Sequence, residues 1–255
     1  MTGVLRFLEH HAVLYRRTWK GTIFVSFVSP LLFLAAMGLG LGSLISQGPV
    51  RTVDGVSYLA FLAPGLLAAT TMQTAYVETT YPIIAKIQWL RTYDGMLATP
   101  LTIGNVVVGE ICWLAFRLAT VAIIFFLVML VFGTVHTTLA PLAILVAILN
   151  GLAFGAPILA FTATQKTDNA FSVIGRFIIT PLFLLGGAFF PIHQLPQFLQ
   201  GIAWLTPLAH GVALARGLTI GRITSSAGMD VVVLLGYATV GIIAASITMR
   251  RRLSK

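Results

Sequence analysis

Cysteine and acidic side chains are nearly absent from this 255-residue chain. Cys112 is the single cysteine, so an intrachain disulfide and a cysteine-ligated metal cluster are both excluded. Only 7 residues are acidic and 9% are charged, whereas a soluble domain of this size carries about 25% charged residues. The composition therefore excludes an ordinary soluble domain.

The motifs of several common enzyme classes are also missing. No Gly-x-x-x-x-Gly-Lys-Ser/Thr phosphate loop occurs, so the chain cannot hydrolyse ATP by that route. The five histidines lack the His-Glu-x-x-His spacing of a zinc site, and no Gly-x-Ser-x-Gly elbow is present. Acidic residues deep within apolar stretches, which mark proton and sodium relays, are lacking too. We therefore expect no catalytic residue, no metal site and no cofactor bound by this chain.

What the chain has is six long apolar stretches. A helix needs about 20 consecutive apolar residues to cross the hydrocarbon core of a bilayer, and 58% of this chain is hydrophobic. We predict an all-α integral membrane protein, with one membrane domain over residues 1–255 and no separate soluble module. The six predicted transmembrane helices cover residues 22–45, 58–81, 103–132, 139–164, 171–190 and 230–249.

The placement of Lys and Arg predicts the orientation. If the N-terminus is cytoplasmic, twelve basic residues lie inside and three outside, with Arg117 within a span. Cytoplasmic loops carry an excess of Lys and Arg, so both termini are predicted to lie inside. The net charge is +9, but no basic run is interleaved with aromatic residues in a way that would follow a phosphate backbone. We therefore expect no nucleic-acid partner.

Residues 1–20 precede the first span. Phe7, His11, Leu14 and Trp19 recur at helical spacing, while the charged side chains lie largely elsewhere around the helix. This pattern predicts an amphipathic helix that lies along the cytoplasmic headgroup layer. A solvated tail with a few apolar residues is the alternative.

Residues 84–98 form the most unusual segment outside the spans, and the charge count places them in the cytoplasm. On a single helix they would present one aromatic and apolar stripe with polar edges, which suits a helix-in-groove contact with another protein. A helix whose Trp and Tyr anchor it to lipid is the alternative. The stripe consists of Trp89, Tyr93 and Leu97, and the edges include Arg91 and Asp94.

Three charged residues belong to or adjoin the predicted spans. Glu78 lies near the cytoplasmic end of the second span, and Glu110 and Arg117 are seven residues apart in the third, hence on one helical face. A charge this far into a bilayer is costly. Arg117 is therefore expected either to snorkel to the cytoplasmic headgroups or to pair with Glu110 or Glu78.

Residues 191–220 are apolar but interrupted by prolines. Such short, broken segments cannot span a bilayer, so they should dip into the outer leaflet or lie on it. We predict re-entrant helices here.

Three short motifs in this order resemble those of type-2 ABC exporter permeases, in the branch of nodulation-type lipooligosaccharide and antibiotic exporters. Together with the predicted topology, the resemblance covers nearly the whole chain. The motifs are YLAFLAPG at residues 58–65; YDGMLATPL at 93–101 with Gly109-Glu110 and Trp113; and FFP at 189–191 with Leu195-Pro196, Pro207-Leu208 and Arg216.

The resemblance implies a permease subunit without its own ATPase, in the bacterial cytoplasmic membrane. Such permeases form homodimers or heterodimers, and the dimer binds two separate cytoplasmic ATPase subunits, which carry ATP and Mg²⁺. The expected substrate is a hydrophobic or amphiphilic molecule: a drug or antibiotic, a lipid or a lipooligosaccharide.

The resemblance also implies roles for two segments. Residues 84–98 would be the coupling helix that contacts the ATPase, and residues 191–220 would cap the translocation path. The outer gate would then include Phe189, Phe190, Pro191, Leu195 and Pro196.

Two other classes of function compete with this interpretation. A secondary transporter driven by an ion gradient would need no ATPase. This chain, however, lacks the central acidic residues and the inverted repeat that are typical of that class. A membrane enzyme would need a polar site clustered at one membrane face, and the sequence shows none.

Overall fold

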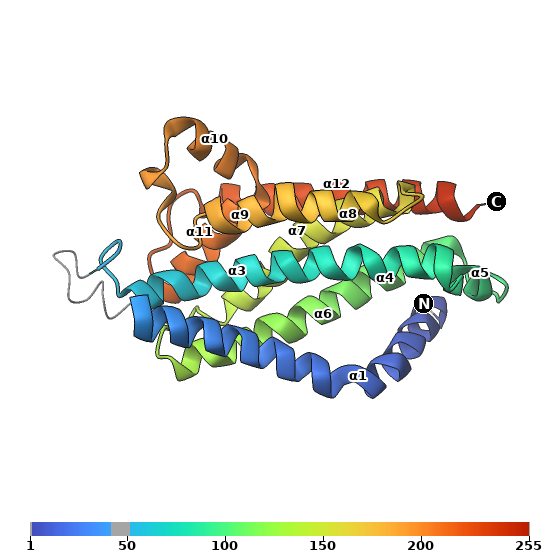
Figure 1. Cartoon of the computed structure of the whole chain (residues 1–255), viewed down its shortest axis with the longest axis horizontal. Coiled ribbons are helices and arrows are strands. Elements are labelled where there is room, and N and C mark those ends of the chain that lie inside the picture. Colours follow the sequence, from blue (N-terminus) through green and yellow to red (C-terminus); the bar gives the residue numbers. More distant parts are fainter. Residues whose placement is uncertain (1, 42–51, 255) are drawn as a thin grey trace.

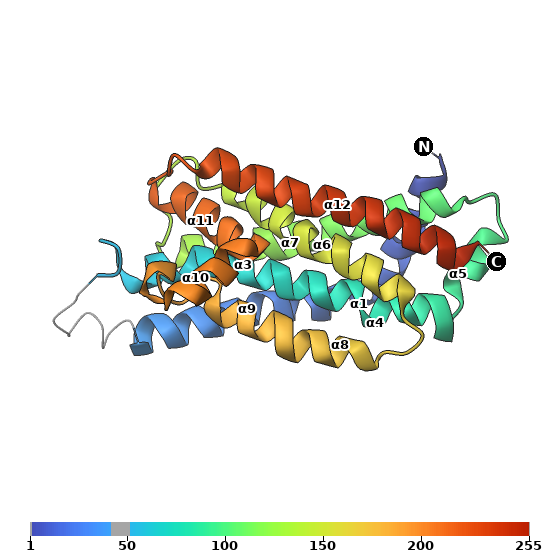
Figure 2. The same cartoon turned by 90° about the horizontal axis from the view of Figure 1, so that it is seen from above.

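The computed structural model describes residues 2–41 and 52–254 and shows a bundle of helices along one long axis (Figure 1). Within these residues the only β-type pairing is an isolated bridge between Val53 and Val56. Both ends of the chain lie toward the same end of the bundle in both views (Figures 1 and 2). That both termini lie on the cytoplasmic side of a membrane stays a prediction.

Among the described residues, five helices are longer than 20 residues, and shorter helices and turns connect them. The long ones are α1 (Thr2–Ala35), α3 (Tyr58–Thr79), α6 (Ile103–Val131), α7 (Leu142–Thr164) and α12 (Ala227–Leu253). The shorter ones are α4 (Tyr81–Ile84), α5 (Thr92–Leu97), α8 (Asn169–Ile174), α9 (Thr180–Leu185), α10 (Gln197–Leu205) and α11 (Pro207–Ile220). Wider π-helical turns cover Ala36–Leu41, Ala85–Trp89 and Gly175–Ile179, and a 3₁₀ turn covers Ile192–Gln194.

Local sequence signals explain several helix ends. The Ser57 hydroxyl accepts a hydrogen bond from the Ala60 amide at 3.3 Å at the start of α3, and Thr102 caps α6 in the same way. Such caps satisfy amides that have no partner in the first turn of a helix. Gly221 ends α11 in the left-handed conformation, with φ 87°, which costs glycine little.

The helix α1 is bent. Its parts Gly3–Gly21 and Ser26–Gly38 meet at 56°, close to the predicted boundary between the interfacial helix and the first span. The two predicted elements are therefore one bent helix, and the end of the predicted span, residues 42–45, lies outside the described residues.

Three described helices are long and apolar enough to cross a membrane: α6, α7 and α12. The number rises to five if α1 and the pair formed by α10 and α11 each cross as one bent span. The predicted count of six spans therefore stays a prediction. The predicted span 171–190 is a shorter continuous helix, Asn169–Leu185, which ends before Gly186.

The helix α3 lies at the centre of the bundle, against α6, α7 and α11. Most of its residues are buried, and a polar contact ties it to α7: the Asn150 amide donates to the Ala68 carbonyl at 2.9 Å. A buried polar side chain needs such a partner, and this one fixes the register of two otherwise apolar helices. α3 therefore packs against the helices that carry the polar residues described below, which are Glu110 and Arg117 on α6 and Arg216 on α11.

Candidate functional site

The predicted coupling segment, residues 84–98, is not one helix. The chain continues from α4 through the π-helical turn Ala85–Trp89, and Arg91 then adopts the left-handed conformation with φ 49° before α5 begins. This residue interrupts the helix and turns α5 into a new direction. The expected single stripe at spacing i, i+4 and i+8 is therefore wrong.

The interruption separates the predicted contact residues. Trp89 and Leu90 are 60% and 73% exposed, whereas Tyr93 is completely buried. Arg91 and Asp94 are exposed and Leu97 is half-buried. We call the exposed residues Trp89, Leu90 and Arg91 the tip. Trp89 and Arg91 thus lie together at the surface, whereas Tyr93 points into the protein interior.

Tyr93 is buried because it belongs to a polar cluster around Glu110. One carboxylate oxygen of Glu110 accepts hydrogen bonds from the Tyr93 hydroxyl and from the Lys86 ammonium, each at 2.6 Å. Glu110 is only 4% exposed. The three residues come from the π-helical turn, α5 and α6. The cluster therefore fixes the segment that carries the tip to a long helix of the bundle.

His11 of α1 completes this Glu110 cluster. Its Nε2 accepts from the Lys86 ammonium at 2.9 Å, and its Nδ1–H donates to the Phe7 carbonyl at 3.2 Å. Burial lowers the pKa of His11 below its ordinary value, and the charge of Lys86 lowers it further. The imidazole is therefore neutral at pH 7, and its 3.6 Å separation from Glu110 is not an ion pair.

The Tyr93 hydroxyl keeps its proton. Burial raises its pKa well above the ordinary value, and the negative charge of Glu110 adds to this effect. The cluster thus combines one cation, one carboxylate and two neutral donors or acceptors. The sequence singled out Glu110 and Tyr93 but missed Lys86 and His11 as their partners. One feature of the sequence could have indicated Lys86: Glu110 lies near the start of a long apolar helix, and a buried carboxylate there requires a nearby cation.

Arg117 lies about two turns beyond Glu110 along α6, and its side chain forms one of the contacts that the sequence left open. Its Nε and Nη2 both contact Glu78 of α3 at 2.8 Å. Its guanidinium also lies 5.1 Å from the centre of the Tyr15 ring. Arg117 therefore pairs with Glu78 rather than with Glu110, and the pair joins α3 to α6.

The predicted outer-gate residues lie at the opposite end of the bundle. The Phe189 ring packs against Phe183 at 5.1 Å and Phe33 at 6.0 Å, and Pro191 is buried. Phe190 and Leu195 are half-buried and Pro196 is exposed. The five residues thus lie in one region of the bundle, but they do not form a common exposed surface. A gating role stays a prediction.

A buried arginine anchors this outer region. Arg216 of α11 donates to the Phe61 carbonyl at 3.2 Å and to the Gly187 carbonyl at 2.7 Å, and its guanidinium lies 3.6 Å from the centre of the Phe61 ring. Gly65 allows the close approach, because a Cβ there would lie 2.7 Å from the Ala188 Cα. Arg216 therefore connects α11, α3 and the segment after α9.

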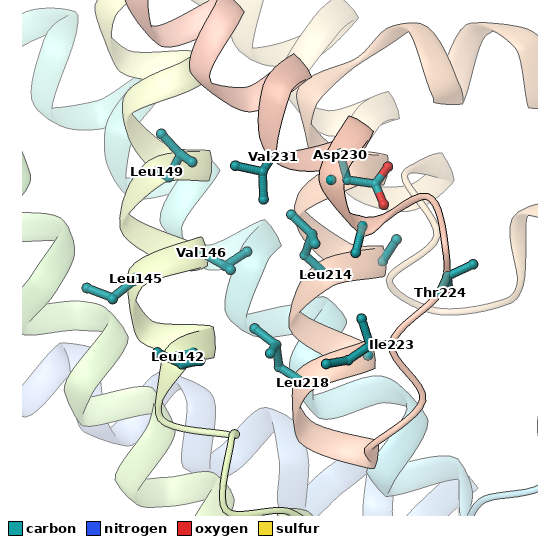
Figure 3. A pocket seen from close by; sticks show the side chains of 14 residues that line it. Leu142, Leu145, Val146, Leu149, Leu214, Leu218, Ile223, Thr224, Asp230 and Val231 are labelled. Carbon is teal, nitrogen blue, oxygen red and sulfur yellow. The ribbon is translucent and has the colours of Figure 1, made fainter.

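A second polar contact joins α10, α11 and α12. His210 lies 2.6 Å from the Asp230 carboxylate through Nδ1, and its Nε2–H donates to the Trp204 carbonyl at 2.8 Å. Asp230 also borders an apolar cavity of about 430 Å³ between α7, α11 and α12, shown in Figure 3. In Figure 3 the Val146 side chain of α7 points toward Leu214 of α11 across this cavity. Neither feature was predicted, because the residues come from distant parts of the chain.

These features are those of a helical membrane protein: apolar helices long enough to cross a bilayer, a polar cluster beside the exposed tip, and broken helices at the other end. The family model of the ABC-2 type transporter matches residues 7–220. The chain therefore belongs to the ABC-2 type transporter family and is a membrane subunit of that kind.

Individual relatives agree with this family. Nodulation protein J of Rhizobium leguminosarum bv. viciae is 34% identical over 241 residues, which cover 93% of this chain and 91% of that protein. Nodulation protein J of Rhizobium meliloti (strain 1021) is 32% identical over 239 residues, 92% and 89% of the two chains. The inner membrane transport permease YadH of Escherichia coli (strain K12) is 26% identical over 200 residues, 78% and 75% of the two chains.

Proposed function

We propose that this chain is the permease subunit of an ABC exporter in the bacterial cytoplasmic membrane. It moves a hydrophobic or amphiphilic substrate outward, such as a drug or antibiotic, a lipid or a lipooligosaccharide. A separate cytoplasmic subunit hydrolyses the ATP, and two permeases form the path. Membership of the ABC-2 type transporter family supports this proposal, as does the similarity to an inner membrane transport permease.

The exposed tip is the observation that carries the proposal. Trp89 and Leu90 are 60% and 73% exposed at the end of a helical turn, next to the exposed cation Arg91. Tryptophan and arginine are the residues that most often dominate the binding energy of protein interfaces. A short apolar protrusion of this kind fits a groove on a partner subunit.

The Glu110 cluster explains how such a contact could move the bundle. Lys86 is three residues before Trp89, and Tyr93 is two residues after Arg91, so hydrogen bonds to Glu110 hold both sides of the tip. A displacement of the tip would therefore move α6 and, through His11, the start of α1. Rigid-body shifts of packed helices are one established way to transmit such a change.

The decisive experiment is purification of the tagged protein from its native membranes. We expect an ATPase subunit to co-purify with the wild type. Truncation of one interface tryptophan commonly costs more than about 2 kcal/mol, equivalent to roughly thirtyfold in affinity. Trp89→Ala should therefore lose most of the co-purified subunit and of the substrate-stimulated ATPase activity.

Phe198→Ala is the matched control, because Phe198 is a similarly exposed aromatic residue, 69%, at the opposite end of the bundle. It should retain the ATPase subunit. If Trp89 only anchors the segment to lipid, Trp89→Ala will retain the subunit as well. If no ATPase subunit co-purifies, and the isolated protein transports substrate along an ion gradient, the chain is a secondary transporter.

A further inference from the structure

A groove runs between the first half of α1 and the side of α6. Its volume is about 480 Å³, it lies on the predicted interfacial helix at the bend of α1, and its lining includes no residue of the tip or of the outer gate. We propose that this groove binds an anionic phospholipid of the surrounding leaflet. One acyl chain fills the groove, and the phosphate lies against Arg16 and Lys20.

The groove has an apolar, aromatic lining. Tyr15, Trp19 and Ile23 follow one another at intervals of four residues on α1, and Trp113 and Phe116 face them from α6. Ring contacts fix this wall: the Tyr15 ring lies 5.7 Å from Trp113 and 5.9 Å from Phe116. Because the walls are held by these contacts, the groove exists before a ligand arrives and does not need to be opened.

The edge of the groove is basic. Arg16 lines it directly, and Lys20 follows one helical turn later on the same face. Both are exposed, and neither forms an ion pair within residues 2–41 and 52–254. The first 41 residues contain one acidic residue, Glu9. A basic edge beside an apolar groove at a membrane surface matches the phosphate and the acyl chain of one lipid.

The bend in α1 explains why a lipid fits better than a protein segment. The two halves of α1 meet at 56°, so the basic half lies across the bundle at headgroup depth while the apolar half continues along it. Trp19 and Phe116, 41% and 48% exposed, thus face the position where headgroup and acyl chain join. This inference requires only that the chain lies in a membrane. It does not depend on the substrate or on the ATPase.

Tryptophan quenching by brominated acyl chains tests the proposal directly. The full-length variant Trp89→Phe/Trp204→Phe keeps only the two groove tryptophans, Trp19 and Trp113. In phosphatidylcholine bilayers, a few mole per cent of brominated phosphatidylglycerol should quench the tryptophan fluorescence of this variant. The quenching should be far stronger than the mole fraction of the brominated lipid alone would produce. Brominated phosphatidylcholine should quench only in proportion to its share.

Charge variants test the role of the basic edge. Each cation near an anionic lipid contributes roughly fivefold in affinity, so Arg16→Gln/Lys20→Gln should weaken the preference by roughly twenty-five-fold. Arg17→Gln removes a neighbouring charge that points to a different side of the helix, and it should keep most of the preference. Equal quenching by the two brominated lipids, or an unchanged preference in Arg16→Gln/Lys20→Gln, would overturn the proposal.

The unmodified protein offers an independent measurement. Cys112, the single cysteine of the chain, lines the groove and is exposed. Phosphatidylglycerol should slow its reaction with a membrane-permeant maleimide severalfold relative to phosphatidylcholine alone. If protein density slows the reaction and lipid composition does not, a second copy of the chain covers the groove, and the lipid proposal is wrong.

Discussion

Replacing Glu110 with glutamine tests the central polar cluster. The substitution preserves the shape of the side chain but removes its charge. The Lys86 side chain, only 17% exposed, would then lack its counter-ion, and the Tyr93 hydroxyl would lose a charged acceptor. Breaking a buried pair costs about 3–5 kcal/mol. The partial exposure of Lys86 reduces this, and we expect a loss of about 2–4 kcal/mol.

The loss should be visible in thermal unfolding of the purified protein in detergent, followed by tryptophan fluorescence. A change of 1 kcal/mol shifts the melting temperature of a chain of this size by roughly 2–4 °C, so Glu110→Gln should melt roughly 5–15 °C below the wild type. Asp94→Asn is the matched control: it removes an exposed carboxylate from the same region and should change stability by less than about 0.5 kcal/mol.

A double-mutant cycle isolates the contact itself. Lys86→Met alone leaves a buried carboxylate unpaired, whereas Lys86→Met/Glu110→Gln removes both charges. The double variant should be more stable than the sum of the single losses by about 1–3 kcal/mol. Additive losses would show that the two side chains do not interact. Wild-type melting of Glu110→Gln would refute the whole description of the cluster.

Three further predictions concern other parts of the molecule. Burial holds the pKa of His11 below its ordinary value of 6.5, so the unfolded chain binds a proton at higher pH than the folded one. The melting temperature should therefore be at its full value above pH 6.5 and fall as the pH drops below it, and His11→Gln should remove this part of the pH dependence. Arg216→Gln leaves two buried carbonyl oxygens without their donor and should cost about 2–4 kcal/mol in unfolding free energy, whereas Arg216→Lys should cost less. Gly65→Ala should lower the melting temperature because its Cβ would overlap Ala188, at about 1–3 kcal/mol, whereas Gly95→Ala, where a Cβ meets nothing, should not lower it.

Much of the helical architecture could be predicted from hydrophobicity, because burial in lipid requires long runs of apolar residues. The predicted spans 103–132, 139–164 and 230–249 correspond to α6, α7 and α12 with modest differences at the ends. The change of direction near residue 21 was expected from the boundary between the interfacial helix and the first span, but the continuity of α1 across it and the central position of α3 were not. Both depend on which helices pack together, and an apolar pattern on all sides of a helix does not specify its neighbours.

The polar contacts were harder to predict, because the residues involved are far apart in the chain. For Arg117 the sequence left three states open, namely snorkelling, a pair with Glu110 and a pair with Glu78, and the structure forms the pair with Glu78. A helix repeat predicts which side chains share a face, not which neighbouring helix presents the opposite charge. The tip shows a second limit. One residue in the left-handed conformation, Arg91, separates Trp89 from Tyr93, and no periodicity in the sequence signals it.

The separation of Trp89 from Tyr93 matters for the proposed mechanism. If both aromatic rings were exposed on one helix, the segment could still bind a partner, but Tyr93 would not connect it to the long helices of the bundle. In the structure the Trp89 ring is exposed, whereas the buried Tyr93 donates its hydroxyl hydrogen bond to Glu110. Force applied at the tip therefore acts on α6 through short, charge-assisted hydrogen bonds, which are stronger than neutral ones. Tyr93→Phe removes one of the two hydrogen bonds that join the segment to Glu110 and keeps Trp89, so it should retain the ATPase subunit while its transport becomes less tightly coupled to hydrolysis. Loss of the subunit in Tyr93→Phe would show instead that the cluster shapes the docking surface itself.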